Sequence, residues 1–444
     1  MRIHATGLHN IAKRRLSTGV RRRAHVGLAL MLGLVLSARM IPSANAQTPP
    51  QAPTLNVLHW WTSASERAAA DRLVQQLAAQ GVGWHDDAIP GGGGGAAIKV
   101  LTSRVLAGEA PDVAQVIGRT LTDWADLGLV LPLDDVAQRG RWRQVMFPVV
   151  LQTVSRGGRI MAAPLGVHRI NTLLYNRHVW TRLNLAPPQS WHDMEVAAKA
   201  MRAQRITPLA WSDEPWQIAT VFEAVLLAEG GPALYAELAS TQGWSSWQDA
   251  RVVAALQRLR WLRDLDDEAT TEEPWTTPAR KLQTGQAGMF IMGDWARGEL
   301  MAWGSQPGTD FGCVPVPQTA GMHLYSIDTL AMLVGRFPKR AEQERLAEVI
   351  ASPATQMTYN QAKGSVPVRM DIDPAALDEC ARDSWQTLAR PGSALLPSIT
   401  HRMAAVESTR EALGEVLHRF VKTRSVTPQQ AQAQLLAIVR GAAQ

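Results

Sequence analysis

The feature that most constrains the fold of this chain is the alternation of short apolar, strand-like segments with amphipathic, helix-like segments. Apolar runs predict strands over residues 54–61, 111–118, 287–293, 311–317 and 324–334. Apolar residues at the 3.6-residue period predict helices over residues 65–80, 96–108 and 340–352. This alternation is typical of a sheet covered by helices, so the sequence predicts an α/β fold. With 444 residues, the chain is long enough for two or three domains.

The positive net charge of +6 arises from the N-terminal segment. Residues 1–46 contain eight of the 45 basic residues and no acidic residue, which leaves 37 basic against 39 acidic residues in the remainder. A basic start, the apolar run 26–38 and the small-residue sequence Ala44-Asn45-Ala46 form the pattern of a cleavable export signal. The alternative is a membrane anchor, but the apolar run is shorter than the roughly 20 residues that a spanning helix needs. We therefore expect residues 1–46 to be a signal peptide of a periplasmic or secreted protein that does not bind nucleic acid.

The chain has two cysteines, Cys313 and Cys380. An exported protein meets an oxidising compartment, which favours a disulfide between them over two buried free thiols. The bridge would be structural, because the sequence contains no C-x-x-C redox motif.

Motifs of catalysis and of metal binding are absent from the sequence. The run Gly91 to Gly95 is not followed by Gly-Lys-Ser/Thr, so it is a flexible turn rather than a phosphate-binding loop. The sequence has no H-E-x-x-H, no G-x-S-x-G and no His and acidic residues at metal-ligand spacing. We expect no catalytic residues, no metal and no cofactor.

Tryptophan is unusually abundant, with 16 residues against six phenylalanines and four tyrosines. An indole is a wide apolar face with one donor at its edge, which suits the C–H face of a sugar ring. Trp60 and Trp61 are the last two residues of the predicted strand 54–61 and precede the turn of residues 62–65. If the strand ends at or between them, both indoles project from its carboxyl end, where open α/β sheets bind ligands.

Nine segments in order carry a resemblance to a known family. They are LHWWTSASE (58–66), GGGGGAAIKVLTSRVLAGEAPDVAQ (91–115), APLGVHRINTLLYN (163–176), EPWQIATVFEAVLLAEGG (214–231), GQAGMFIMGDWARGE (285–299), FGCVPVPQT (311–319), SIDTLAML (326–333), KGSVPVRMD (363–371) and LLPSITHRMA (395–404). From about residue 54 onward, the chain resembles the glucose- and mannose-type periplasmic sugar-binding proteins of bacterial ABC importers. These belong to the family 1 extracellular solute-binding group, which includes maltose-binding protein.

The resemblance implies a maltose-binding-protein-like fold of two α/β lobes, the type II periplasmic binding protein fold. A hinge that the chain crosses three times would join the lobes, near Pro164, near Pro315 and within 363–367. The N-terminal lobe would comprise residues 54–164 and 316–364, and the C-terminal lobe residues 165–315 and 365–444.

The resemblance also implies a sugar-binding site between the lobes. The expected sugar-contacting residues are Trp60, Trp61, Glu66, Gln115, Trp295, Asp328, Lys363 and His401. Weaker candidates are His168, Trp216, Gln217 and Asp294. In such a site, carboxylates accept hydrogen bonds from paired sugar hydroxyls, lysine and histidine donate them, and indoles cover the ring faces.

Several of these residues have simpler explanations. Glu66 follows Ser63 in an S-x-x-E pattern and could be the capping-box residue of the next helix. Lys363 could be a solvated charge and His401 an ordinary structural histidine. For Asp294, a structural acceptor beside Trp295 is the favoured interpretation.

One position departs from the family pattern. Thr102 stands where the family commonly has a lysine that reaches the sugar. Lys99 lies three residues earlier on the same predicted helix face and could substitute for it. The departure puts glucose itself in question as the ligand.

The sequence therefore predicts a non-enzymatic, monomeric sugar-binding component of an ABC importer, with a monosaccharide and the membrane permease with its ATPase as partners. Two alternatives stay open. A secreted glycoside hydrolase would also combine tryptophans with paired carboxylates. A sugar-binding protein that serves a chemoreceptor would share the same site.

Overall fold

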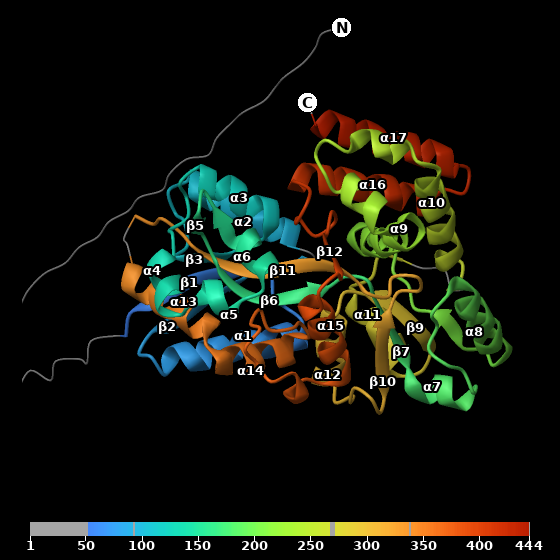
Figure 1. Cartoon of the computed structure of the whole chain (residues 1–444), viewed down its shortest axis with the longest axis horizontal. Coiled ribbons are helices and arrows are strands. Elements are labelled where there is room, and N and C mark those ends of the chain that lie inside the picture. The colour runs from blue at the N-terminus through green and yellow to red at the C-terminus, as the bar shows by residue number, and fades with distance from the viewer. Residues whose placement is uncertain (1–51, 92–93, 267–270, 337–338, 444) are drawn as a thin grey trace, which may run out of the picture. The chain divides into compact units, whose positions relative to one another are not determined.

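The computed structural model describes residues 52–91, 94–266, 271–336 and 339–443, which fold around two sheets and two hydrophobic cores. The predicted signal peptide lies outside these residues. Figure 1 shows the long strand β11 running through the middle of this part of the chain, beside β6. Helices cover the two sheets, as the alternating sequence predicts.

The first sheet has the order β12-β11-β3-β1-β2, and β6 pairs with β11. Strand β1 is parallel to β2 and β3, whereas β11 is antiparallel to β3 and β6. The strands are β1 (Thr54–His59), β2 (Gly83–Ala88), β3 (Val113–Gln115), β6 (Ala163–Arg169), β11 (Met322–Met332) and β12 (Ala394–Pro397). The helices around it are α1 (Ala64–Ala78), α2 (Gly95–Leu106), α3 (Gly118–Asp126), α4 (Asp134–Arg139), α5 (Trp142–Val145), α6 (Pro148–Val154), α13 (Arg340–Ala351), α14 (Pro353–Lys363) and α15 (Glu379–Ala389). A short hairpin of β4 (Ser155–Arg156) and β5 (Arg159–Ile160) and the short 3₁₀ helix η3 (Pro374–Ala376) complete this half.

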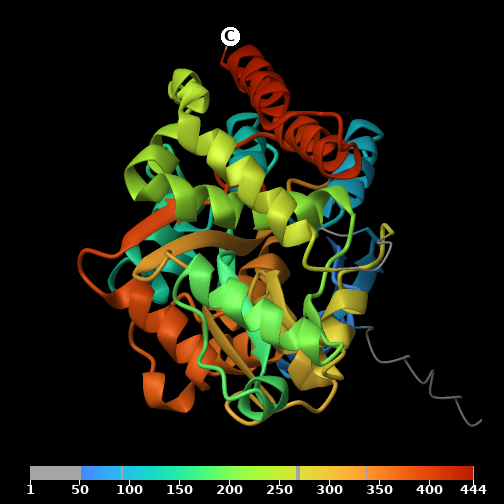
Figure 2. The same cartoon turned by 90° about the vertical axis from the view of Figure 1, so that its right-hand side faces the viewer.

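The second sheet has the order β10-β7-β9-β8. Its strands are β7 (Thr172–Asn176), β8 (Thr207–Leu209), β9 (Ala287–Met292) and β10 (Phe311–Pro315). The helices of this half are α7 (Arg177–Arg182), α8 (Trp191–Ala203), α9 (Pro215–Leu238), α10 (Ala250–Arg263), α11 (Thr276–Gln283), α12 (Trp295–Ala302), α16 (Glu407–Lys422) and α17 (Pro428–Ala442). The short 3₁₀ helix η2 (Trp244–Gln248) lies between α9 and α10 in the chain. Figure 2 shows the red helices α16 and α17 beside the yellow-green segment that contains α10.

Helix α9 is the central helix of the second core. It is apolar on nearly all sides and mostly buried, and the helix changes direction at Gly231, which has a φ of 72°, just before Pro232. Its length and composition would by themselves allow a membrane span, and it is the one described helix of which this is true. Burial all round is the property of a core helix in a folded protein.

Local sequence explains why α1 begins where it does. Ser63 and Glu66 form a capping box, in which each side chain accepts a hydrogen bond from the other residue's backbone N–H. Ala69, Ala70, Leu73 and Leu77 recur at helical spacing and are buried against the first sheet. The capping role that the sequence suggests for Glu66 is therefore present.

The two cores show where the chain passes from one half to the other. The buried side chains belong to the first core up to Val167 and to the second core from Ile170 to Leu324. They belong to the first core again from Ile327 to Leu388, and to the second core from Leu396 onward. The first two changes occur along the hydrogen-bonded pair β6 and β11, which continues past Pro164 with one shift of register between Asp328 and Thr329.

These positions lie further along the chain than the predicted crossings near Pro164, Pro315 and residues 363–367. Pro315 is paired with Thr172 inside the second sheet. The buried apolar residues between 366 and 388 belong to the first core, whereas the partly buried Cys380 packs against the second. We propose that one lobe comprises residues 54–167 and 327–388, and the other residues 170–324 and 396–443.

A disulfide joins Cys313 in β10 to Cys380 in α15, with the Cα atoms 5.5 Å apart. The sequence favours this pairing over two free thiols. The bridge connects a strand of the second sheet to a helix whose residues Ala381 and Leu388 pack in the first core.

Candidate functional site

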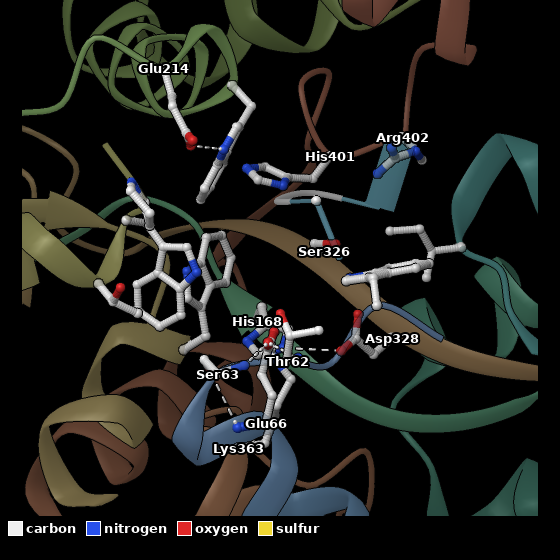
Figure 3. A pocket seen from close by; sticks show the side chains of 18 residues that line it. Thr62, Ser63, Glu66, His168, Glu214, Ser326, Asp328, Lys363, His401 and Arg402 are labelled. Atoms are coloured by element: carbon white, nitrogen blue, oxygen red, sulfur yellow. Dashed lines mark hydrogen bonds and ion pairs between the residues drawn. The ribbon is translucent and has the colours of Figure 1, made fainter. Parts of the chain in front are cut away.

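A cavity of about 400 Å³ lies where the two halves of the chain meet, a size typical of small-molecule sites. Strands β6 and β11 supply His168, Ser326 and Asp328, and the pairing of Ser326 with His168 brings these side chains to one place. Figure 3 shows Glu66 and Lys363 on one side of the pocket and Glu214 on the opposite side. The lining residues are Trp60, Thr62, Ser63, Glu66, Gly91, Ile117, His168, Glu214, Trp216, Pro274, Trp275, Thr276, Trp295, Ser326, Asp328, Lys363, His401 and Arg402.

The two tryptophans that follow β1 have different environments. The strand ends at His59, before both of them. Trp60 lines the pocket, and Gly94 lies against its ring. Trp61 is fully buried in the first core, stacked on His59 at 4.7 Å and edge-on to Tyr359 at 6.1 Å. The prediction that both indoles face the ligand is therefore wrong for Trp61, because successive side chains of an extended segment point to opposite faces.

Glu66 and Lys363 form a charged pair at the floor of the pocket. Glu66 Oε2 accepts the backbone N–H groups of Thr62 and Ser63 at 3.0 and 3.1 Å, while Oε1 lies 3.3 Å from Lys363 Nζ. Lys363 is buried rather than a solvated surface charge. The capping bonds thus hold one carboxylate oxygen, and the ammonium orients the other beside the cavity.

A second charged group consists of His168 between two carboxylates. Its Nδ1 lies 2.6 Å from Asp294 Oδ1, and its Nε2 lies 3.4 Å from Asp328 Oδ2. Burial lowers the pKa of His168, but the two carboxylates outweigh it and the net shift is upward. Burial raises the pKa of Asp328, but the hydrogen bond from His168 and the charge of Lys363 bring it below the ordinary value. Asp328 therefore presents an ionised carboxylate, a strong acceptor for hydroxyl groups.

Trp295 is the centre of an aromatic wall. It lies edge-on to His168 and His401, at centroid distances of 5.4 and 5.3 Å, and tilted to Trp216 at 6.4 Å. It is the first residue of α12, and Gly293 lies directly against its ring. This wall offers apolar ring faces beside the polar floor.

His401 comes from a loop that is held by one buried carboxylate. Glu223 in α9 accepts hydrogen bonds from Ser398 Oγ at 2.7 Å, from Thr400 Oγ1 and from the backbone N–H of Ile399. His401 Nε2 lies 3.0 Å from Thr220 Oγ1. Burial and the nearby positive charge of Arg402 lower the pKa of His401 to about 3, so the imidazole is neutral.

Arg402 lines the pocket beside His401 and bridges the two halves of the chain. Its guanidinium lies 5.9 Å from the Trp60 ring centroid and pairs with Glu407, and its backbone carbonyl accepts the N–H of Arg119 at 2.8 Å. Its φ of 65° is unusual for a residue with a side chain.

Most of the predicted site residues meet in this pocket: Trp60, Glu66, Trp295, Asp328, Lys363 and His401, with His168 and Trp216 from the weaker candidates. The others do not line it.

Three of the residues outside the pocket are buried beneath it. Gln115 accepts the backbone N–H of Trp60 at 3.3 Å, and Gln217 donates to Glu214 at 2.9 Å. Asp294 accepts from the backbone N–H of Arg169 at 3.0 Å and contacts His168, so it is the structural acceptor that the sequence favours. These residues support pocket side chains rather than face the cavity.

Helix α2 contributes none of its predicted ligands. The Lys99 side chain is 69% exposed and pairs with Glu411 at 3.0 Å, and Thr102 bonds its own helix at Ile98 O. Lys99 is therefore not a substitute for the family's lysine in this structure.

Sequence reasoning missed several lining residues. Ser63 and Thr62 were visible only as a turn, and Glu214 stands just before a helix in the quoted motif EPWQ. Trp275 and Arg402 follow no pattern that marks a ligand. Among the described residues, no group of three or more His, Cys, Asp or Glu side chains could hold a metal ion.

Residues 88–385 match a known family, described as bacterial extracellular solute-binding protein. The chain belongs to this family. It is a family of solute-binding proteins rather than of enzymes, which decides against the glycoside hydrolase that the sequence leaves open.

Individual proteins support this assignment. A probable sugar-binding periplasmic protein of Brucella melitensis is 34% identical over 86% of this chain and 91% of its own length. An uncharacterized ABC transporter extracellular-binding protein of Pyrococcus horikoshii is 28% identical over 90% of this chain and 91% of its own. The solved structure of the bacterial solute receptor AcbH, described as exclusively preferring β-D-galactopyranose, covers 88% of this chain and 100% of its own with a TM-score of 0.76 at 16% identity. The predicted two-lobe α/β fold, shared with maltose-binding proteins, is confirmed.

Proposed function

We propose that this protein binds a monosaccharide in the pocket between its two halves and delivers it to the membrane permease of an ABC importer. The observation that carries the proposal is the composition of one cavity. The carboxylates of Glu66 and Asp328 lie on the same floor as the donors Lys363 and His168, beneath the aromatic face of Trp295. Hydroxyl pairs of a sugar ring need such acceptors and donors side by side, and the C–H face of the ring needs an indole.

The two proposed lobes contribute different parts of this site. Trp60, Glu66, Asp328 and Lys363 belong to the first core's half, whereas Trp295 and His401 belong to the second. A sugar that touches both groups favours the arrangement in which the lobes are closed, by its higher affinity for that arrangement. The closed form is what a permease would distinguish. Periplasmic location and the names of the relatives in Brucella and Pyrococcus support the same role.

Binding of free hexoses tests the proposal. Tryptophan fluorescence should change on adding at least one hexose, with a Kd on the order of micromolar, equivalent to roughly 8 kcal/mol. Trp295→Ala should weaken that affinity and reduce the compaction that small-angle scattering detects on adding sugar. Trp303→Ala, at the other end of the same helix and outside the pocket, is the matched control.

Asp328→Asn tests the polar floor. It should weaken the free energy of sugar binding by a few kcal/mol, because sugar hydroxyls and His168 lose a charged acceptor in a desolvated site. Asp126→Asn, at an exposed carboxylate paired with Arg156, should leave Kd unchanged. If both Trp295→Ala and Asp328→Asn bind sugar with wild-type affinity, this pocket is not the sugar-binding site. If the protein hydrolyses glycosides and releases reducing sugar with turnover, the proposed function is wrong.

A further inference from the structure

Glu214 brings a negative charge to the side of the pocket opposite Glu66 and Lys363 (Figure 3). It directly precedes α9, and its Oε2 accepts hydrogen bonds from Trp216 Nε1 at 2.6 Å and from Gln217 Nε2 at 2.9 Å. Gln217 is fixed in turn by Ser212 Oγ at 3.1 Å and by the carbonyl of Glu273 at 2.9 Å. The carboxylate is thus held in one orientation at the cavity wall.

The other charged residues of the pocket each form an ion pair within the protein, although Asp328 shares His168 with Asp294. Glu66 pairs with Lys363 at 3.3 Å, Asp328 with His168 at 3.4 Å, and Arg402 with Glu407. The groups that donate hydrogen bonds to the Glu214 carboxylate are neutral N–H groups, and no Lys, Arg or His in the described part of the chain forms an ion pair with it. Glu214 is therefore the carboxylate of this pocket whose charge the described protein leaves without a cation.

The neighbours of Glu214 in the pocket are aromatic. Trp216 and Trp275 line the cavity with it, and Trp295 lies 6.4 Å from Trp216 between ring centroids. Indole faces attract cations through their quadrupole, most strongly where water is excluded. A carboxylate without a cationic partner, set among indoles, is an environment that favours an ammonium group over a hydroxyl group.

We propose that the pocket selects a sugar that carries a positively charged amino group, with the ammonium placed at Glu214 and the hydroxyls at Glu66 and Asp328. This inference rests on the proposed sugar-binding function and narrows its ligand class. A hydroxyl group would also make a charge-assisted hydrogen bond to this carboxylate. An ammonium adds the Coulomb attraction of a full positive charge, partly offset by the cost of removing the amine from water, so the amine should be preferred by about tenfold.

The test compares each neutral hexose with its amino and N-acetylamino derivatives by calorimetry at fixed pH. Glucose, galactose and mannose, their 2-amino-2-deoxy forms and 6-amino-6-deoxyglucose cover different positions of the amine. At least one amino sugar should bind about tenfold or more tightly than its hexose and its N-acetyl derivative. Because the preference is electrostatic, the ratio of the hexose Kd to the amino-sugar Kd should fall as the salt concentration is raised.

Glu214→Gln should bring the ratio of hexose to amino-sugar Kd close to one, whatever it does to either value alone. Glu237→Gln, at a carboxylate that bonds Ser246 away from the pocket, is the matched control and should keep the wild-type ratio. If a neutral hexose binds as tightly as every amino derivative, the amino-sugar inference is overturned while the sugar-binding function stands. If no member of the panel binds, both are overturned.

Discussion

His401 should make the protein less stable in mild acid, by an amount that can be worked out from its environment. The side chain is 8% exposed and lies near the cations Arg402 and Arg410. Burial and these charges lower its pKa from 6.5 to about 3 in the folded protein. At pH 5 the unfolded chain therefore binds a proton at this histidine and the folded protein does not.

The sign follows from that difference in protons bound. A depressed histidine pKa favours unfolding as pH falls below about 6.5, and the loss continues until pH reaches the folded value of about 3. One pKa unit corresponds to about 1.4 kcal/mol, so lowering pH from 7 to 5 should cost about 2 kcal/mol of unfolding free energy through His401. The raised pKa of His168 acts in the opposite sense, since its contribution is lost as pH rises.

Urea unfolding at pH 7 and pH 5, at constant ionic strength and without sugar, measures this term. His401→Gln should lose about 2 kcal/mol less than the wild type between the two pH values, even if it is less stable at both. His192→Gln removes an exposed histidine and should follow the wild type. Equal losses in wild type and His401→Gln would refute the conclusion that the pocket holds this imidazole neutral.

Three further predictions concern neighbouring parts of the structure. Trp60→Ala should weaken sugar binding at least tenfold in fluorescence titration, whereas Trp61→Phe should leave Kd within about twofold and lower the unfolding free energy by about 1–3 kcal/mol, because Trp61 is core. Glu299→Gln should lower the unfolding free energy measured in urea by about 1–2 kcal/mol, since this buried carboxylate accepts two backbone N–H groups at the start of α1, at 2.9 and 3.3 Å. Replacing Cys313 and Cys380 together by serine should cost up to about 4 kcal/mol by loop entropy for a separation of 67 residues, and unchanged thermal stability would contradict the estimate.

The fold class and most of the strands and helices named in the sequence analysis could be predicted, because the strand and helix periods are local signals. The helices predicted over 65–80, 96–108 and 340–352 appear as α1, α2 and α13 with ends shifted by a few residues. The lobe boundaries were predicted at or near prolines. In the structure, two of the three passages from one core to the other lie along β6 and β11, and the third lies between α15 and β12. Which core a strand residue joins depends on packing from distant segments, and no local pattern reports it.

The site was predictable to the extent that motifs placed residues near β6, β11 and α14. Sequence could not separate Trp60 from Trp61, because the direction of each indole depends on where β1 ends and the chain turns. Gln115 was expected at the ligand and Gln217 was a weaker candidate, yet each hydrogen-bonds a pocket residue from outside the cavity, Gln115 at the backbone of Trp60 and Gln217 at the Glu214 carboxylate. Asp294 bonds His168 in the structural role that the sequence favoured. Glu214 was missed because a glutamate before a helix is common, and only the structure shows that it faces the cavity.

Helix α12 couples the pocket to the contact between the two halves. Its first residue, Trp295, lines the cavity, and its Glu299 bonds the start of α1. Between them, Gly298 lies so close to α14 that a Cβ there would be 2.6 Å from the backbone carbonyl of Lys363. The absence of a side chain at this position therefore sets the distance between the Trp295 face and the Lys363 ammonium.

Gly298→Ala should push α12 away from α14 and separate the two sides of the site. We expect at least tenfold weaker sugar binding and a loss of about 1–3 kcal/mol of unfolding free energy, the usual cost of overpacking. Gly414→Ala is the matched control in the helix α16, where a Cβ would meet its nearest neighbour at 3.8 Å, and it should be neutral or slightly stabilising. If Gly298→Ala binds sugar as the wild type does, the spacing between α12 and α14 does not determine affinity, and the coupling through this helix is wrong.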